Sequence, residues 1–327
     1  MKNNKLLRKD YLMKNYKIGI DLGGTNIAVG IVTEEGEIAA KKSVKTGSQR
    51  PFEEIVKDMA SCTLSLLEEN EISLKNVSHL GIGAPGSIDT ANGVIVYANN
   101  FKYGDHVPMA NLLKQYIDKP VYIGNDANVA ALGEVISGAA KGLKNAIMIT
   151  LGTGVGGGIV IDGKIYEGQH SAGAELGHIM LVKDGEQCTC GRKGCWEAYA
   201  SATALIRQTA KAMKENPDSI MNQLTTLDNV SGRTAFEAAR KGDKAGQEVV
   251  DRYIEYIAEG LIDMINIFRP EILIIGGGIC NEGDYLLKPM RSYINKNVYA
   301  GSRFPEQKIA VAKLGNDAGI IGAAFLR

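Results

Sequence analysis

Three of the five cysteines in this chain lie within eight residues, in the segment QCTCGRKGCW at 187–196. Cys188, Cys190 and Cys195 are separated by one and four residues, and thiolates at such spacings can converge on one metal ion. His178 is the nearest histidine upstream of them. The four side chains predict a structural zinc site, because they fill all four positions of a tetrahedral ion. The alternative is a surface loop that carries free thiols.

Two carboxylates flank this cysteine segment. Glu175 lies three residues before His178, and Glu197 lies two residues after Cys195. We expect a metal that orders the loop to bring both carboxylates to one place. Carboxylate oxygens accept hydrogen bonds from hydroxyl groups, so the segment predicts a site for a polyhydroxylated ligand such as a sugar.

Two glycine-rich turns share one pattern. The stretches KIGIDLGGTNIAVGIV at 17–32 and AIMITLGTGVGGGIVIDGKI at 146–165 each predict two strands joined by a glycine turn. A third glycine run, 276–278, ends the buried strand predicted for EILIIGGGI. Backbone N–H groups at such turns can bind anions, and the repetition predicts a duplicated architecture with a ligand cleft between its halves. The alternative is that these are tight turns without a ligand.

Neither turn matches a standard nucleotide-binding motif in full. Gly158 to Lys164 has P-loop spacing, but Ile165 stands where a magnesium-binding hydroxyl is required. The glycines at 152, 154 and 157 spell G-x-G-x-x-G, but an alternating strand follows them instead of a helix. The sequence therefore argues against a P-loop enzyme and against a nicotinamide-dependent enzyme.

A further carboxylate follows a predicted buried strand. In VYIGNDANVAALGEVISGA, Asp126 comes where the strand passes into a helix. A carboxylate at a strand end can remove a proton from an alcohol, or it can merely cap a helix that begins at Ala127. Amphipathic helices are predicted over 51–70 and 247–268, and a closing helix is predicted after Asn316 or Asp317 as its cap.

The composition limits the partners. Lys plus Arg and Asp plus Glu are balanced at 37 each in 327 residues, which leaves no basic surface for nucleic acid. No apolar run is long enough to cross a membrane, and the N-terminal segment lacks the apolar core of a secretory signal. We expect a cytoplasmic protein whose partners are a small molecule and copies of itself. Residues 1–12 are expected to be a leader, because Met13 opens the first strand naturally.

Taken together, these motifs closely resemble the ROK family of sugar kinases and sugar-sensing repressors, and within it the ATP-dependent glucokinases. The resemblance runs from Tyr16 to the end of the chain. DLGGTN at 21–26 is similar to the first phosphate motif of the family, LGTGVGGG at 151–158 to the second, and GGG at 276–278 to its adenosine motif. GAELGH at 173–178 and CTCGRKGCWE at 188–197 are similar to its signature and zinc loop. The second histidine of the fructokinase zinc loop is lacking.

The resemblance implies an α/β protein with the actin-like, hexokinase-like (ribonuclease H-like) fold, in which two duplicated domains enclose a ligand cleft. The smaller domain would comprise residues 14–124 together with the C-terminal helix 315–327. The larger domain would comprise residues 125–314, with the zinc loop and the ATP-binding elements. A homodimer or homotetramer is expected.

The resemblance also assigns site residues. Asp126 would be the catalytic base, and His178 would hold structural Zn²⁺ with one ring nitrogen and a sugar hydroxyl with the other. Asp21 would hold Mg²⁺ through water. The sugar contacts would be Gly86, Ser87, Asn100, Asn125, Asp126, Glu175, His178 and Glu197. The ATP contacts would be Asp21, Gly23, Gly24, Thr25, Asn26, Gly152, Thr153, Gly154, Gly276, Gly277 and Gly278. The zinc ligands would be His178, Cys188, Cys190 and Cys195.

The activity that the resemblance implies is ATP-dependent phosphorylation of a hexose at its 6-hydroxyl, with glucose as the first expectation. N-acetylglucosamine and N-acetylmannosamine are the alternative substrates. From another class, a sugar-sensing regulator would carry a winged helix-turn-helix ahead of the first hairpin, where only sixteen residues precede Lys17. A catalytically silent sugar-binding protein is a third alternative, and the presence of Asp126 argues against it.

Overall fold

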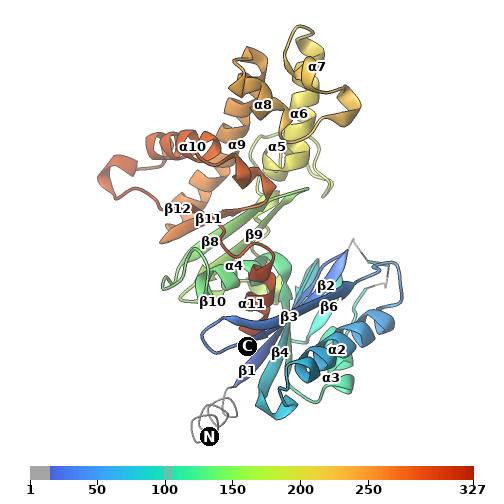
Figure 1. Cartoon of the computed structure of the whole chain (residues 1–327). Coiled ribbons are helices and arrows are strands. Elements are labelled where there is room, and N and C mark those ends of the chain that lie inside the picture. Colours follow the sequence, from blue (N-terminus) through green and yellow to red (C-terminus); the bar gives the residue numbers. More distant parts are fainter. Residues whose placement is uncertain (1–14, 99–100, 103–104) are drawn as a thin grey trace, which may run out of the picture. The chain divides into compact units, whose positions relative to one another are not determined.

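The computed structural model of the chain describes residues 15–98, 101–102 and 105–327 (Figure 1). The expected N-terminal leader and Asn100 lie outside these residues. The chain forms two compact units. Among the described residues, the first unit contains those up to Ala146 together with Gly158–Ala174 and Ala312–Arg327, and the second contains Ile147–Gly157 and Glu175–Val311.

The first unit is built on a five-stranded sheet of order β3-β2-β1-β4-β7. Its strands are β1 Tyr16–Leu22, β2 Asn26–Val32, β3 Ile38–Lys45, β4 Val77–Ala84 and β7 Val121–Asn125. The antiparallel pairing of β1 with β2 confirms the predicted hairpin, and β3 pairs with β2 in the same antiparallel manner. β4 pairs in parallel with β1 and β7, so the carboxyl ends of these three strands meet at one edge of the sheet. A small ribbon of β5 Ser87–Asp89 and β6 Val94–Tyr97 follows β4.

Alternating residues of β1 face different helices. Ile18 and Ile20 are fully buried in one core with residues of α2 Phe52–Glu69 and α3 Met109–Tyr116. On the other face lies α11 Asp317–Ala324, close against two glycines. A Cβ atom on Gly19 would lie 1.8 Å from the Ile320 carbonyl oxygen, and one on Gly81 would lie 1.8 Å from the Ala323 oxygen. The helix backbone therefore rests directly on the sheet.

The helix α4, Asp126–Ile136, packs on α11 in the same close manner. A Cβ atom on Gly322 would lie 1.8 Å from the Val129 carbonyl oxygen, and one on Gly133 would lie 2.2 Å from the Ala318 oxygen. Both contacts join backbone to backbone, so neither glycine can be enlarged without separating the helices.

The second five-stranded sheet has the order β10-β9-β8-β11-β12. Its strands are β8 Ala146–Leu151, β9 Val155–Ile161, β10 Lys164–Ile165, β11 Ile272–Gly276 and β12 Ile309–Val311. In chain order, both sheets run third, second, first, fourth and fifth strand. The predicted duplication of the architecture is therefore confirmed.

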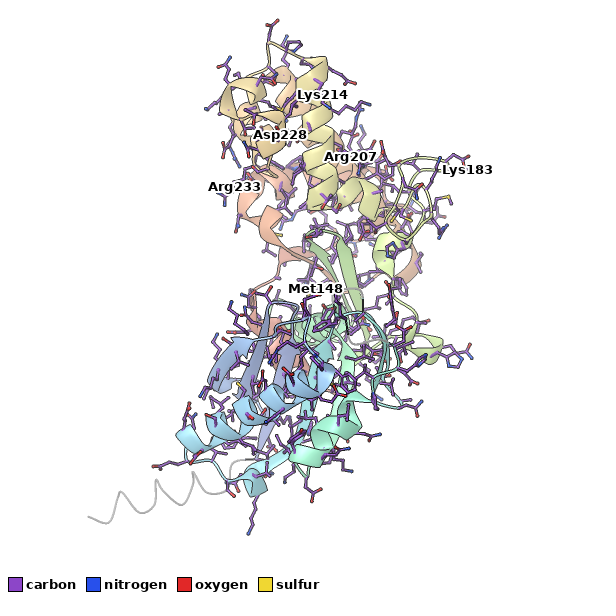
Figure 2. The ribbon with its side chains drawn as sticks, turned by 90° about the vertical axis from the view of Figure 1, so that its right-hand side faces the viewer. Met148, Lys183, Arg207, Lys214, Asp228 and Arg233 are labelled. Atoms are coloured by element: carbon purple, nitrogen blue, oxygen red, sulfur yellow. The ribbon has the colours of Figure 1, made fainter. Side chains whose placement is uncertain are left out.

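Helices dominate the second unit after Ser201. The elements are α5 Glu197–Ala200, α6 Ala202–Glu215, α7 Met221–Leu224, α8 Thr234–Arg240, α9 Lys244–Phe268 and α10 Asp284–Asn297. Figure 2 labels Arg207 and Lys214 on α6. The helix predicted over 247–268 is α9, which begins earlier because the Asp243 carboxylate caps it through the Gly246 N–H at 2.6 Å. Short 3₁₀ turns occur at Leu74–Asn76, Gln169–Ser171, Leu176–His178, Leu227–Asn229, Gly278–Glu282 and Gly301–Arg303.

Across the described ranges, no helix combines the length and the apolar character that a membrane crossing needs.

One expectation about the closing helix differs from the structure. The α11 helix begins at Asp317, but neither Asn316 nor Asp317 caps it with a side-chain hydrogen bond. The Asp317 carboxylate instead accepts a hydrogen bond from Lys41 Nζ at 2.7 Å, so it forms a salt bridge with a residue of β3.

Residues 125–146 and 158–174 pack with the first unit, because α4 rests on α11. That packing does not test where the domains move, so the boundary between residues 124 and 125 stays a prediction.

Candidate functional site

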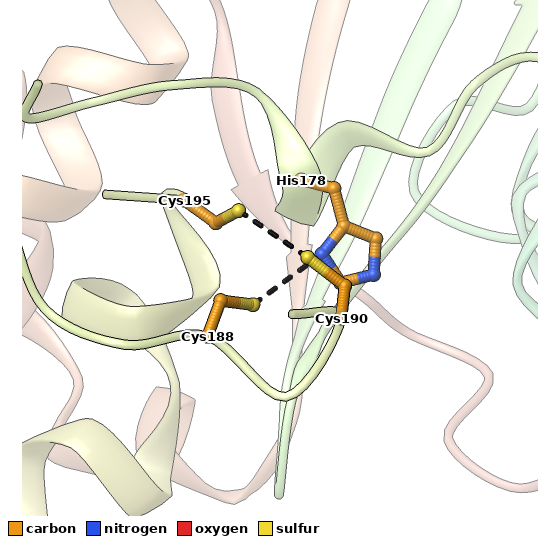
Figure 3. Close-up of side chains that lie close together, drawn as sticks. All are labelled: His178, Cys188, Cys190 and Cys195. Atoms are coloured by element: carbon orange, nitrogen blue, oxygen red, sulfur yellow. Dashed lines mark hydrogen bonds between the residues drawn. The ribbon is translucent and has the colours of Figure 1, made fainter. Parts of the chain in front are cut away.

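The four predicted metal ligands come together in the second unit (Figure 3). Their ligand atoms all lie within 4.8 Å of one another. Cys188 Sγ lies 3.7 Å from His178 Nδ1, and Cys190 Sγ lies 3.6 Å from Cys195 Sγ. Donor atoms around a tetrahedral zinc ion with 2.3 Å bonds to sulfur are about 3.8 Å apart, whereas disulfide sulfurs are about 2.05 Å apart. The donor set and its spacing therefore fit one tetrahedral metal ion.

Local turns shape this metal loop, residues 178–195, in which Figure 2 labels Lys183. The Cys188 N–H donates to the Arg192 carbonyl oxygen at 2.8 Å, and this closes a small turn that carries Cys190. Gly194 has a left-handed φ of 81° and packs against the Val182 carbonyl oxygen, 1.8 Å from where a Cβ atom would stand. Glycine is therefore required at residue 194.

A buried tryptophan anchors the end of the loop. Trp196 follows Cys195 directly, is fully buried, and donates from Nε1 to the Tyr256 carbonyl oxygen of α9 at 2.7 Å. A Cβ atom on Gly260 would lie 2.1 Å from the indole ring, so α9 packs flat against it. Cys195 and Glu197 are thereby held by the longest helix of the described chain.

The pKa values of two thiols in the cluster shift in opposite directions. Burial, together with hydrogen bonds shared with Cys190 and Cys188, raises the pKa of the Cys195 thiol to about 12. A backbone hydrogen bond from Arg192 lowers the pKa of Cys190. A bound divalent cation reverses the cost of forming buried thiolates, because its charge stabilises the ionised sulfurs.

Glu197 joins the metal loop to the second glycine turn. One carboxylate oxygen accepts from the Val155 N–H and the other from the Thr189 hydroxyl, each at 3.0 Å. This link was not foreseen, because it depends on where β9 places its first N–H group. Glu175 is exposed and directly precedes the turn that carries His178. The expected convergence of Glu175 with Glu197 stays a prediction.

In the first unit, the polar residues gather where β4 and β7 end. The Asn125 side-chain oxygen accepts from the Ala127 N–H at 3.0 Å and the Asn128 N–H at 3.3 Å, and its amide donates to the Gly86 carbonyl oxygen at 3.1 Å. Asn125 is therefore the cap of α4, and the alternative in which Asp126 caps a helix that begins at Ala127 is wrong.

Asp126 is exposed and is the first residue of α4. Its carboxylate accepts from the Ala127 N–H at 2.8 Å. Ser87 is also exposed, at the start of β5. Asn125, Gly86 and Ser87 thus lie along one edge with Asp126, whereas Asn100 is outside the described residues.

Asp21 stands close to the same edge, near the end of β1. Burial, and secondarily the charge of Asp126, raise the pKa of Asp21 to about 6. Its carboxylate packs against α11, 2.8 Å from where a Cβ atom on Gly319 would stand. Two neighbouring carboxylates repel each other, and a cation between or beside them relieves that repulsion.

The three glycine runs each lie at strand ends. In the first turn Gly23 N–H donates to the Asn26 carbonyl oxygen at 3.0 Å, and Gly24 and Thr25 are exposed between them. In the second turn Gly152 N–H donates to Gly154 at 3.0 Å, with Gly152 and Thr153 exposed.

The third run follows β11. Gly276 is buried at the strand end, while Gly277 and Gly278 are exposed. Gly277 has a φ of 101°, and its Cα lies so close to the Leu151 carbonyl oxygen that a Cβ atom would be 2.1 Å away. Glycine is therefore required at residue 277.

Two sheets of matching strand order, each with a glycine turn between its first two strands, define an actin-like sugar-kinase fold. The chain matches the ROK family over residues 17–327, and it belongs to that family.

Similar proteins are known in sequence and in structure. A glucokinase of Thermotoga maritima is 37% identical over 310 residues, which cover 94% of this chain and 96% of that enzyme. A xylose repressor of Caldicellulosiruptor bescii is 29% identical over 307 residues, 93% of this chain and 76% of the repressor. The solved structure of a ROK family glucokinase from Streptomyces griseus, in complex with glucose and AMPPNP, has a TM-score of 0.75 and 36% identity, and the match covers 95% of this chain and 98% of that one.

The raised pKa of Asp21 predicts a pH-dependent stability. Because the folded state holds this proton up to about pH 6 and the unfolded state releases it near pH 4, stability falls as the pH rises between these values. Asp21→Asn removes this loss, so the variant should gain up to about 3 kcal/mol relative to the original protein from pH 4 to pH 6. Urea unfolding across this range measures it. Asp228→Asn, at an exposed carboxylate, is the control. If the free energy of unfolding of Asp21→Asn changed with pH in the same way as that of the original protein, the prediction would be contradicted.

Proposed function

We propose that this protein is an ATP-dependent hexokinase that phosphorylates glucose at the 6-hydroxyl. The observation that carries the proposal is the exposed Asp126 carboxylate at the β7–α4 junction, within the electrostatic influence of the half-buried Asp21. Two relatives support it: a 37% identical glucokinase, and a 36% identical glucokinase that binds glucose and an ATP analogue.

Asp126 is assigned the role of general base. An alcohol is a weak nucleophile, so a carboxylate takes the proton from the 6-hydroxyl as its oxygen bonds to phosphorus. The hydrogen bonds of Asn125 fix the first turn of α4, and this fixes the backbone from which Asp126 projects. Phosphoryl transfer depends mainly on positioning, so a rigid support for the base raises the rate.

The ATP contacts are assigned to the exposed glycine turns. The N–H groups near Gly24 and Gly152 would hold phosphate oxygens, and the run 276–278 would contact the adenosine. Asp21 is assigned the role of holding a Mg²⁺ ion through water, because Mg²⁺ prefers carboxylate and water oxygens as ligands. Bound magnesium would neutralise charge on the transferred phosphoryl group.

The sugar contacts are assigned to Gly86, Ser87, Asn100, Asn125, Asp126, Glu175, His178 and Glu197. His178 Nδ1 faces Cys188, which leaves Nε2 for a sugar hydroxyl. We assign the metal of the cluster as structural zinc, since four protein ligands leave no position for water. Zinc would thus fix the orientation of the imidazole that meets the sugar.

A sugar-responsive regulator is the second candidate. It is favoured by the 29% identity with a xylose repressor over 93% of this chain. A regulator needs to bind a sugar but needs no general base, so turnover distinguishes the two functions.

The proposed function predicts the substrate. Coupled measurement of ADP release with Mg-ATP, across hexoses and N-acetylhexosamines, should give the highest kcat/KM for glucose. A higher value for N-acetylglucosamine or N-acetylmannosamine would reassign the substrate within the same chemistry. Sugar binding without turnover on any member of the panel would favour the regulator.

The Asp126→Asn variant should bind glucose with nearly unchanged affinity and lose roughly 10²- to 10⁴-fold in kcat, because the amide cannot accept the proton. Calorimetry measures the binding and the coupled assay measures kcat. Asp118→Asn, at an exposed aspartate, is the control. Near-normal turnover by Asp126→Asn would remove this residue from the role of base.

Elemental analysis should find about one zinc per chain in protein never exposed to a chelator. Cys190→Ser removes one ligand, so it should abolish stoichiometric zinc and lower the melting temperature. Cys280→Ser is the matched control, because Cys280 lies outside the cluster. Less than about half an equivalent in the original protein would contradict the zinc assignment.

A further inference from the structure

Glu134 is a fully buried carboxylate near the end of α4. One of its oxygens accepts from two backbone N–H groups, those of Lys313 at 2.9 Å and Leu314 at 2.8 Å. The other accepts from the Ala139 N–H at 2.6 Å. Within the part of the chain that the structure describes, no Lys, Arg or His side chain forms a salt bridge with it.

Three donors and no acceptor suit the ionised form, which only accepts hydrogen bonds. A buried carboxylate is tolerated when hydrogen bonds replace its lost water, and these three backbone groups supply them. The fit is close, because a Cβ atom on Gly138 would lie 2.0 Å from the same carboxylate oxygen that accepts from Ala139. Loss of the carboxylate would leave buried N–H groups without a partner.

The three donors belong to two separate parts of the chain. Ala139 follows the end of α4, whereas Lys313 and Leu314 lie between β12 and α11. They come just after Val311, where the chain passes from the second unit into the first. Glu134 therefore ties the segment that leads into α11 to the end of α4.

The two helices tied in this way support the proposed reaction site. α4 begins at Asp126, eight residues or a little over two turns before Glu134. α11 packs on α4 through Gly133 and Gly322, and its Gly319 touches the Asp21 carboxylate. A shift of α11 along α4 would thus move the backbone beneath Asp126 relative to Asp21.

We propose that Glu134 is a positioning residue for phosphoryl transfer, an inference that rests on the proposed function. Its carboxylate holds α4 and α11 in one register, and that register sets where Asp126 stands relative to Asp21. Glu134 touches neither sugar nor nucleotide in this scheme. It acts through the helix that carries the base.

The test is Glu134→Gln, which keeps the length of the side chain and replaces one accepting oxygen by an NH₂ group. That group would face an N–H donor, so either the hydrogen bonds from Lys313 and Leu314 or the one from Ala139 must break. Because misplacement by about 1 Å can cost about 10²-fold, kcat per folded molecule should fall about 10- to 100-fold, while the KM for glucose changes little. Amide hydrogen exchange at Lys313 and Leu314, or at Ala139, should become faster.

Two further variants complete the design. Glu37→Gln makes the same chemical change at an exposed site and should leave kcat and exchange unchanged. Glu134→Asp keeps the charge but is one methylene shorter, so it should lose one tie and reduce kcat in the same direction. If Glu134→Gln does not fold, circular dichroism shows this, and Glu134→Asp carries the test.

The outcomes separate the two proposals. A lower melting temperature with unchanged kcat per folded molecule would make Glu134 purely structural and overturn the inference, while the proposed function stands. Equal falls in kcat and in the affinity for glucose would overturn it as well, since the effect would then be general. An original protein that turns over no sugar would overturn both. A fall in kcat alone, with faster exchange at the tied amides, supports it.

Discussion

The first unit depends on the direct contact between the backbone of its last helix and the glycines beneath it. Gly19 and Gly81 of neighbouring strands meet carbonyl oxygens of α11 where a Cβ atom would lie only 1.8 Å away. The outer face of α11 meets α4 in the same way through Gly322. The strands, α11 and α4 therefore form one layered support. This support holds in place the backbone from which side chains such as Asp126 project. The last residues of the chain complete the unit that the first strands begin.

The second unit reaches rigidity by other means. The metal loop folds through tight turns and a cluster of ligands, and Trp196 fastens it to α9. Glu197 then connects the loop to the second glycine turn through Val155 and Thr189. Local structure here depends on polar contacts more than on apolar burial, which agrees with the exposure of most loop residues.

Patterns that repeat along the sequence predicted much of the fold. Alternation and glycine turns predicted β1, β2, β8 and β9, and helical spacing predicted α2 and α9, because these signals depend on neighbouring residues alone. The metal cluster was predictable because three ligands lie within eight residues. The capping of α4 by Asn125, the Glu197 link and the ties of Glu134 were not foreseen. Each of these contacts depends on which backbone N–H groups two distant segments bring together, and the type of a residue does not indicate this.

The burial of Trp196 has a practical consequence. It is the only tryptophan in the chain, and it lies between Cys195 and Glu197, flat against α9. Indole emission is sensitive to the polarity of its surroundings, so the tryptophan emission of this chain comes from the root of the metal loop. Detachment of that loop would shift the emission toward longer wavelength, and the chain thus carries its own optical reporter at this place.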